Sequence, residues 1–178
     1  MDVTQIINKY YPNPNELKHI LWVHCTLVKE KALAIAETHP ELNANKTFLA
    51  EAAMVHDIGI FLTNAPGIQC FGQEHYLRHG VLGADLMRKE GFENHARVCE
   101  RHTGTGLTKE AIIKNKLPLP LQDFLPETIE EQIICFADKF FSKTHLEKEK
   151  TPEQAMHSLE HFGEKGVEIF KEWMIRFL

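Results

Sequence analysis

The sequence predicts an all-α protein, a single-domain orthogonal helical bundle. Two observations support this fold class: apolar residues recur at helical spacing through most of the chain, and helix-start and helix-stop residues divide it into segments of helical length. No segment shows the alternation of apolar and polar residues that is typical of a strand, and the chain has no internal repeat. The usual length of helices then gives roughly seven to nine of them.

The length and composition are those of one folded domain. A chain of 178 residues with 43% hydrophobic residues can bury one core, and no linker-like stretch divides it. We therefore expect a single domain over residues 1–178. Its functional core should span about residues 15–145, with C-terminal helices in residues 152–178 packed on it.

The charge and cysteine patterns argue against several classes of function. A formal net charge of −5 lacks the basic excess that binding to a phosphate backbone needs, so we expect no nucleic-acid scaffold, although a nucleotide substrate remains open. The four cysteines show no Cys-x-x-Cys spacing, which argues against a zinc knuckle or a disulfide framework. Neither a leader segment nor an apolar run of membrane-spanning length is found, so the expected location is the cytoplasm.

Two helices are expected in the first third of the chain. Asn13 can cap the first, Pro14 suits its first position, and apolar residues then follow at helical spacing. The second helix, over residues 48–56, is rich in alanine, and Gly59 supplies its ending. Residues 61–76 lack a pattern and should form a loop long enough to line or cover a pocket.

Capping and stop signals place the remaining helices. Gly91 closes a helix over residues 79–90, and a glycine-rich stretch ends another over about residues 93–102. Thr128 and Glu131 form a capping box that opens an almost continuously apolar helix. The other expected segments are a brief helix at residues 108–115, a solvated helix end or turn at 143–150, a helix opened by a second capping box at 151–154, and a last helix at 167–178.

Three polar residues fall where the helical pattern is apolar. His24 follows Ile20 by four residues and precedes Val28 by four, so its ring should point into the core. His56 continues the apolar face of the second helix, and Asp138 is a lone charge within an apolar run. Burial of such groups is unfavourable unless each is paired or bound to a metal.

His56 and Asp57 stand side by side at the end of the second helix, where both side chains can converge on one point. Imidazole nitrogen and carboxylate oxygen together suit iron, manganese or zinc better than magnesium, which prefers oxygen ligands alone. Such a pair is also compatible with a capping histidine beside a surface aspartate. A metal centre shared with His24 and Asp138, however, satisfies all four groups at once.

The order of these residues resembles the signature of the HD-domain metal-dependent phosphohydrolase superfamily, which is a histidine, a later His-Asp pair and a distant aspartate. The matching residues are His24, His56, Asp57 and Asp138. The resemblance covers about residues 15–145. It implies an all-helical HD-like fold, a bound divalent metal and hydrolysis of a phosphate ester or anhydride.

Two further histidine motifs resemble those of the dinuclear HD members, especially the bacterial diadenosine tetraphosphate hydrolase branch. They are HGVLGA at residues 79–84 and RHTGT at residues 101–105. The resemblance implies two divalent ions, with iron first and manganese, zinc or nickel as alternatives. Without a metal, the two motif histidines would be helix caps. Carried over, one ion takes His24, His56, Asp57 and Asp138, and the second takes Asp57, His79 and His102.

One lysine of the family pattern is missing. HD proteins often follow the His-Asp pair with Gly-Lys, whereas Ile60 occupies the lysine position here. Arg78, Arg101 and Lys139 each stand next to a proposed ligand and are candidates to contact phosphate and offset charge during catalysis. Surface charge is the alternative for each of them. Asp57 is the remaining predicted catalytic residue, because the resemblance makes it the bridge between the two ions.

The resemblance implies hydrolysis of a small nucleotide-like substrate by a metal-activated water. Two alternatives stay open: a di-iron oxygenase, which uses the same ligand types in the HD fold, and a non-catalytic nucleotide-binding module. Such modules usually lack some ligands, whereas all six positions are intact here, so the module ranks last. The sequence identifies neither the substrate nor the oligomeric state, and a homodimer remains open.

Overall fold

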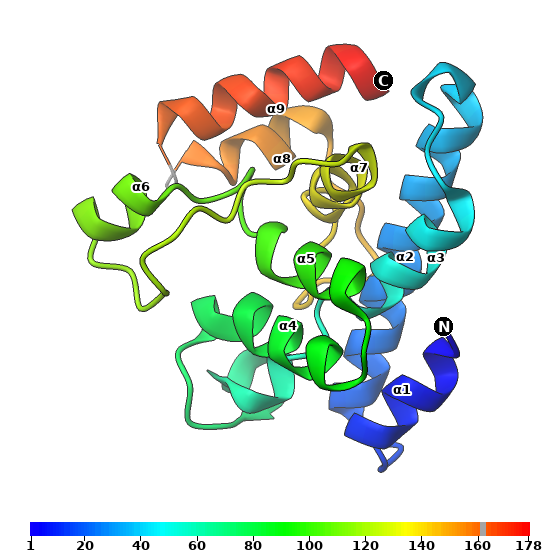
Figure 1. Cartoon of the computed structure of the whole chain (residues 1–178), viewed down its shortest axis with the longest axis vertical. Coiled ribbons are helices and arrows are strands. Elements are labelled where there is room, and N and C mark those ends of the chain that lie inside the picture. Colours follow the sequence, from blue (N-terminus) through cyan, green and yellow to red (C-terminus); the bar gives the residue numbers. More distant parts are fainter. Residues whose placement is uncertain (161–162) are drawn as a thin grey trace.

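The computed structural model describes residues 1–160 and 163–178 and shows an all-α fold, as the sequence predicts (Figure 1). Residues 161 and 162, within the predicted C-terminal helical region, lie outside the described part. The helices are α1 (Val3–Tyr10), α2 (Glu16–Thr38), α3 (Lys46–Val55), α4 (His79–Lys89), α5 (Glu93–Arg101), α6 (Lys109–Lys114), α7 (Ile129–Asp138), α8 (Pro152–His157) and α9 (Glu164–Phe177).

The long helix α2 joins two hydrophobic clusters. Its earlier residues, such as Leu21 and Cys25, pack with residues of α1, α4 and α5. Its later residues, such as Val28 and Ala32, pack with α3, α7, α8 and α9. In Figure 1, α8 and α9 lie together over α7 at the top, while α6 projects to one side. His24 therefore sits on α2 where one apolar cluster gives way to the other.

Capping chemistry sets the helix starts, with one difference from the prediction. Both predicted capping boxes are confirmed, at the starts of α7 and α8. The predicted cap of α2 at Asn13 is wrong: the helix starts at Glu16, and the Asn15 side chain accepts from the Lys18 N–H at 3.0 Å. The sequence offers two asparagines around Pro14, and the backbone of Asn15 is the one that has the extended cap conformation.

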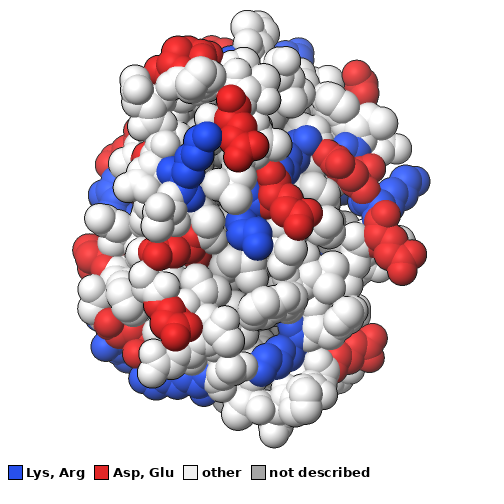
Figure 2. Space-filling view, turned by 90° about the vertical axis from the view of Figure 1, so that its right-hand side faces the viewer, with Lys and Arg blue, Asp and Glu red and all other residues white. Residues whose placement is uncertain are grey.

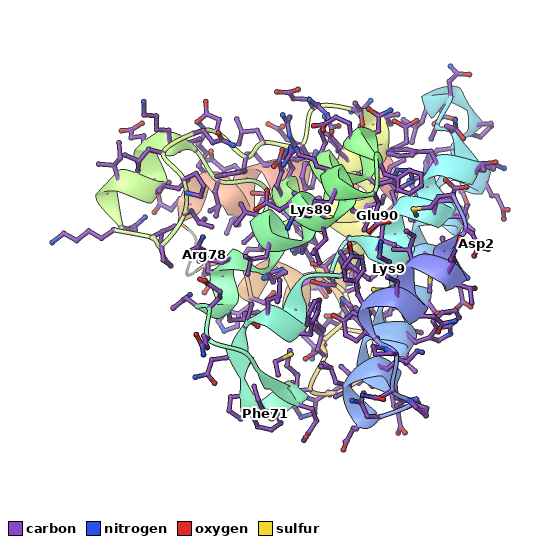
Figure 3. The ribbon with its side chains drawn as sticks, turned by 60° about the horizontal axis from the view of Figure 1, so that its bottom comes forward. Asp2, Lys9, Phe71, Arg78, Lys89 and Glu90 are labelled. Carbon is purple, nitrogen blue, oxygen red and sulfur yellow. The ribbon has the colours of Figure 1, made fainter. Side chains whose placement is uncertain are left out.

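Helix α1 is not among the helices predicted from the sequence. This helix begins after Asp2, whose side chain accepts from the backbone of residue 5, and its Lys9 donates to Glu90 at 2.6 Å (Figure 3). Just after it, the Tyr11 hydroxyl donates to the Ile58 carbonyl at 2.9 Å, close to the His-Asp pair. A helix of this length is marginal by itself, so its stability comes from these tertiary contacts.

The expected loop between α3 and α4 contains short ordered pieces. Two strands of two residues, β1 (Asn64–Ala65) and β2 (Cys70–Phe71), pair antiparallel, although the sequence predicts no strand. Alternation of apolar and polar residues cannot show in so few positions. The loop also holds the 3₁₀ turns Ile60–Leu62, Pro66–Ile68 and Tyr76–Arg78, and a further turn, Pro40–Leu42, joins α2 to α3.

Gly59 has a different role from the one predicted. Helix α3 ends earlier, with His56 as its C-cap, and Gly59 has φ −84°, so it is not a left-handed helix ending. A Cβ at Gly59 would lie 2.4 Å from the His79 carbonyl oxygen and 2.5 Å from the Gly83 nitrogen. The missing side chain lets the His-Asp segment approach the first turns of α4 closely.

On the face drawn in Figure 2, acidic and basic side chains are interspersed, so this face presents no continuous basic surface. The four cysteines are buried and free. In the described part of the chain, no helix combines the length and the apolar character needed to cross a membrane.

Candidate metal centre

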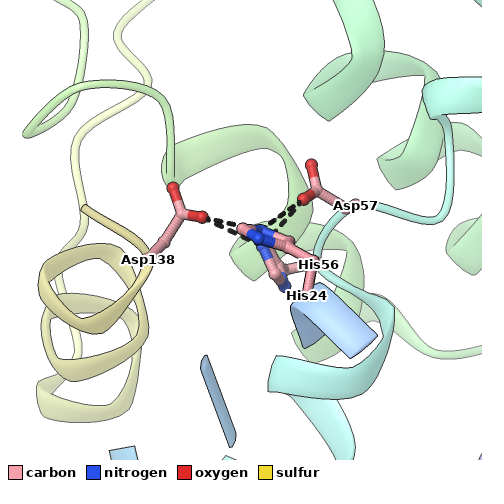
Figure 4. Close-up of side chains that lie close together, drawn as sticks. All are labelled: His24, His56, Asp57 and Asp138. Carbon is pink, nitrogen blue, oxygen red and sulfur yellow. Dashed lines mark hydrogen bonds and ion pairs between the residues drawn. The ribbon is translucent and has the colours of Figure 1, made fainter. Parts of the chain in front are cut away.

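Four ligand-type side chains meet in the core between α2, α3 and α7. Nε2 of His24 lies 3.0 Å from Asp57 Oδ2 and 3.0 Å from Asp138 Oδ1. Nε2 of His56 lies 3.0 Å from the same Asp57 oxygen and 3.5 Å from Asp138 Oδ1. Figure 4 shows both rings between the two carboxylates. All four side chains are buried, so the group forms a closed cluster of nitrogen and oxygen donors.

A second group uses the other oxygen of Asp57. Nε2 of His79 lies 3.3 Å from Asp57 Oδ1, and Nε2 of His102 lies 3.5 Å from it. The two ring nitrogens are 3.0 Å apart. Asp57 thus presents Oδ2 to one pair of histidines and Oδ1 to another, and each of the two groups could hold a metal ion.

Helix ends bring most of these residues together. His56 is the C-cap of α3, His102 is the C-cap of α5, and His79 caps the 3₁₀ turn that leads into α4. Asp138 is the last residue of α7, whereas His24 lies in the middle of α2. Since α2 packs on α3 and α7, and α4 on α5, side chains far apart in sequence converge.

Backbone carbonyls orient three of the four rings. Nδ1 donates to the Ala53 carbonyl in His56 (2.7 Å), to the Tyr76 carbonyl in His79 (2.8 Å) and to the Cys99 carbonyl in His102 (2.7 Å). A carbonyl only accepts, so Nδ1 carries the hydrogen in each ring. The Nε2 atom of each ring is therefore the one directed at the shared carboxylate, as a metal ligand requires.

The residues present fit a bound divalent metal. Neutral His79 and His102 rings would direct two Nε2 lone pairs at each other across 3.0 Å, which a cation between them relieves. Buried polar atoms normally have partners. Among the described residues, His24 Nδ1 forms no hydrogen bond, and His56 Nε2 and both Asp57 oxygens are contacted through ion pairs at 2.6–3.5 Å whose geometry is not that of a hydrogen bond.

Two lysines keep the carboxyl groups ionised. Burial alone raises the pKa of Asp57, but the Lys143 ammonium and His56 outweigh it, so the pKa lies well below the ordinary value. Burial likewise acts to raise the pKa of Asp138, and the neighbouring Lys139 ammonium outweighs it and holds this pKa well below the ordinary value too. Both groups are therefore carboxylates at neutral pH, the form that binds metal.

The histidines divide into two protonation classes. Burial lowers the pKa of His79 to about 3 and also lowers the pKa of His102, so both rings are neutral. Burial also acts to lower the pKa of His56, but the negative charge of Asp57 outweighs it and raises this pKa well above its ordinary value. His56 therefore carries a second proton, on Nε2, and this proton offsets the negative charge of Asp57 as a bound metal cation would.

A model described as the HD domain matches residues 21–143 of the chain. The chain belongs to the HD domain family. HD domains bind divalent metals, and both groups of buried histidines and aspartates in this HD domain could hold a metal ion.

Three curated relatives each match about two thirds of this chain. A tRNA (cytidine(56)-2'-O)-methyltransferase from Thermoplasma volcanium is 38% identical over 120 residues, which are 67% of this chain and 31% of the relative. A protein of the same name from Picrophilus torridus is 34% identical over 69% of this chain and 32% of its own length. The match to this chain therefore spans about a third of the length of these two relatives. An uncharacterized protein from Methanocaldococcus jannaschii is 37% identical over 68% of this chain and 66% of its own length.

Solved structures support the fold. The HD domain of the L. monocytogenes phosphodiesterase PgpH, in complex with cyclic-di-AMP, has a TM-score of 0.54 and 16% identity, with 98% of this chain and 95% of that chain covered. The same PgpH domain in a second structure gives a TM-score of 0.53 and 15% identity over the same shares. This similarity establishes the all-α HD fold.

A cavity of about 550 Å³ opens beside the second ligand group of this HD domain. Its polar side includes His79, His102 and Asp138. Its other side is formed by apolar residues around α6, including Leu107 and Leu117. A volume of this size is typical of small-ligand sites, which span about 300–1,000 Å³. A small molecule in this cavity would touch His79 and His102 on one side and an apolar wall on the other.

Lys143 is the site residue that sequence reasoning missed. The prediction of a solvated helix end or turn over residues 143–150 holds for most of the segment, which is largely exposed turn. It is wrong for Lys143, whose ammonium lies 2.6 Å from Asp57 Oδ2 and whose side chain is only 12% exposed. Tyr76 lies beside it, with its ring centroid 6.0 Å from Nζ. A run of alternating charges in a loop gives no sign that one member folds back into the core, so no sequence signal would have found it.

Of the predicted basic residues, Lys139 reaches the ligand groups. Its Nζ donates to Asp138 Oδ2 at 2.7 Å and to the His102 carbonyl at 2.9 Å, and it lines the cavity. Burial acts to lower the pKa of Lys139, but the ion pair with Asp138 outweighs it and raises this pKa, so the ammonium is charged. Lys139 therefore links the last residue of α7 to the end of α5.

The structure places the two predicted arginines in other networks. Arg78 forms an ion pair with Glu74 at 3.0 Å. Arg101 pairs with Glu127 at 2.9 Å and donates to the carbonyl of residue 125 at 2.9 Å. Neither guanidinium is among the described residues that line the cavity. Arg101 thus joins α5 to the segment before α7, whereas Arg78 pairs within the segment that leads into α4.

Proposed function

We propose that this HD domain is a metal-dependent phosphohydrolase that cleaves a phosphoester or phosphoanhydride bond of a small nucleotide-like substrate. The observation that carries the proposal is the division of Asp57, whose two oxygens face two separate histidine groups beside a cavity. Two ions, with iron first and manganese, zinc or nickel as alternatives, would be held as in the dinuclear diadenosine tetraphosphate hydrolase branch. One would use His24, His56, Asp57 and Asp138, and the other Asp57, His79 and His102.

Each part of the site has a task in this reaction. Bound divalent ions supply an activated water and polarise a phosphate oxygen. The carbonyl-anchored rings hold their Nε2 atoms in place, so the ligand geometry is fixed before substrate arrives. Lys139, itself fixed by Asp138 and the His102 carbonyl, places a positive charge beside the phosphate that is attacked. The apolar wall with Leu107 and Leu117 suits the base of a nucleotide.

The names of the relatives suggest RNA methylation as a second activity to test. Their match to this chain covers about a third of their length, so the rest of those proteins has no counterpart in the match. In this chain, histidines and aspartates grouped around the two oxygens of Asp57 favour hydrolysis. The net charge of −5 and the mixed charges of the surface in Figure 2 also favour a small substrate over a long RNA.

The test combines metal content with product release. The protein is loaded without oxygen with each of the four metals and given mononucleotides, dinucleoside polyphosphates and cyclic dinucleotides. Wild type should bind close to two ions per chain and release a phosphate-containing product. His102→Ala should bind about one ion and lose most activity. His157→Ala is the control, because the His157 side chain is 81% exposed and pairs only with Glu160 among the described residues.

Other outcomes would replace the proposal. Consumption of dioxygen, without release of a phosphate-containing product from any nucleotide, would show an oxygenase. Tight nucleotide binding without turnover would show a binding module. Methyl transfer to tRNA without hydrolysis would assign the activity that the relatives' names give. One ion per chain in both wild type and His102→Ala would leave a mononuclear centre and remove His102 from the ligands.

A further inference from the structure

Lys143 and a metal ion compete for one oxygen atom. The Lys143 ammonium lies 2.6 Å from Asp57 Oδ2. The same oxygen lies 3.0 Å from Nε2 of His24 and 3.0 Å from Nε2 of His56. A divalent ion held by these residues draws on the lone pairs of this oxygen and repels a neighbouring ammonium. Metal binding therefore favours departure of the lysine from Asp57.

Two cavities beside Lys143 offer space for its ammonium group away from Asp57. Lys143 lines the cavity of about 550 Å³ beside His79 and His102 and also a second cavity of about 370 Å³, and Tyr76 lines both as well. The second cavity is further lined by Ser142, Thr144 and Lys150. A flexible side chain at this junction turns between the two spaces by rotation about its own bonds, and the neighbouring Tyr76 ring favours a cation there.

The other cations near the site are already engaged. Lys139 donates to Asp138 and to the His102 carbonyl, and Lys150 donates to the Lys139 carbonyl at 3.3 Å. Lys143 differs from them, because its ion-pair partner is Asp57 Oδ2, the oxygen that would also coordinate the metal. Once displaced, it brings an unmatched positive charge to the junction of two cavities beside the metal centre. A dianionic phosphate is the ligand that such a charge attracts.

We infer that Lys143 binds the phosphate group of the substrate at the junction of the two cavities, and that it exchanges with the metal ion at Asp57. This inference rests on the proposed function and deepens it, since it names a substrate-binding residue and a charge requirement for the substrate. It also fills the role of the lysine that this chain lacks after Gly59. The Lys143 ammonium thus pairs with Asp57 before metal binds and with the substrate phosphate afterwards.

Two binding measurements on the full chain test the inference. Calorimetry first titrates Mn²⁺ into chelator-treated protein, and then titrates inorganic phosphate into protein saturated with Mn²⁺. Lys143→Met should bind Mn²⁺ about tenfold more tightly, because the competing ammonium is gone, and phosphate about tenfold more weakly. Lys143→Arg keeps the charge and should restore phosphate binding. Lys148→Met, an exposed lysine of the same loop, is the matched control and should leave both affinities unchanged.

The opposite signs make the outcome decisive. A purely structural role for Lys143 would weaken both affinities together, and that result would overturn the inference. Unchanged phosphate binding in Lys143→Met would overturn it as well. Neither titration needs turnover, so the two hypotheses fail separately. Opposite shifts without nucleotide hydrolysis in wild type would reject the proposed function alone, whereas hydrolysis with unchanged affinities in Lys143→Met would reject the inference alone.

Discussion

Substitution of Gly59 by alanine should separate the two halves of the metal centre. Gly59 lies two residues after Asp57, and its Cα faces the first turns of α4. An added Cβ would lie 2.4 Å from the His79 carbonyl oxygen and 2.5 Å from the Gly83 nitrogen, where real Cβ atoms keep at least 3.0 Å. These contacts are backbone atoms, so no side-chain rotation can relieve them. The segment that carries Asp57 must move away from α4.

The clash predicts both an energy and a direction of change. The required displacement is roughly half an ångström or more, and overpacking of this kind costs about 1–3 kcal/mol. For a chain of this size each kcal/mol lowers the Tm by about 2–4 °C. Because the movement separates Asp57 from His79, binding of the second ion should weaken more than binding of the first.

Urea denaturation in the presence of a chelator measures the packing cost without a contribution from metal binding, and metal titration then measures the site. Gly67→Ala is the matched control, because a Cβ there meets nothing within 4 Å and the backbone has no left-handed conformation. Its free energy of unfolding should equal that of wild type or rise slightly. If Gly59→Ala were as stable as Gly67→Ala and bound both ions normally, the close approach of the two segments would be refuted.

Three further measurements test other parts of the structure. Removal of divalent metal with a chelator should lower the Tm, and metal at about one hundred times its Kd should restore roughly 2.7 kcal/mol; an unchanged Tm contradicts a metal site. Phe136→Ala, at a buried residue surrounded by aromatic rings, should cost about 3–5 kcal/mol in urea denaturation, and a cost below about 1 kcal/mol contradicts the packing. Burial lowers the pKa of His95, so its stabilising contribution is complete above the unfolded-state pKa of about 6.5 and is lost as pH falls below it. Between about pH 7.5 and 5.5, His95→Phe should therefore lose less stability than wild type, and equal losses would contradict this reasoning.

The sequence predicted those features that depend on local chemistry. Capping boxes at Thr128 and Thr151 located two helix starts, because the reciprocal hydrogen bonds of a capping box are set within four residues. His24 was identified because its helical spacing from Ile20 and Val28 fixes its direction. The all-α class follows from the same periodicity, which is a property of each segment alone.

Features that depend on contacts between distant segments were not predicted. Helix α1 is short and is held by partners such as Glu90 and Ile58, far along the chain. Gly59 is a glycine because α4 passes over it, and no residue near Gly59 in the sequence records that contact. Lys143 reaches Asp57 only through the turn that follows α7. In each case the cause is a tertiary approach, which local pattern does not encode.

The position of the histidines at helix ends explains how their rings are fixed. Inside a helix, most carbonyls already accept from the N–H four residues later, whereas the last carbonyls have no such partner within the helix. At their helix or turn ends, His56, His79 and His102 each donate Nδ1–H to the carbonyl three residues before them, and the Tyr76 carbonyl also accepts the backbone N–H of His79. His24 lies inside α2, and among the described residues its Nδ1 finds no partner. Its orientation must come from the carboxylates of Asp57 and Asp138, each 3.0 Å from Nε2. His24 therefore depends on the cation-binding group itself for its geometry, whereas the other three rings are set by the backbone before any ion binds.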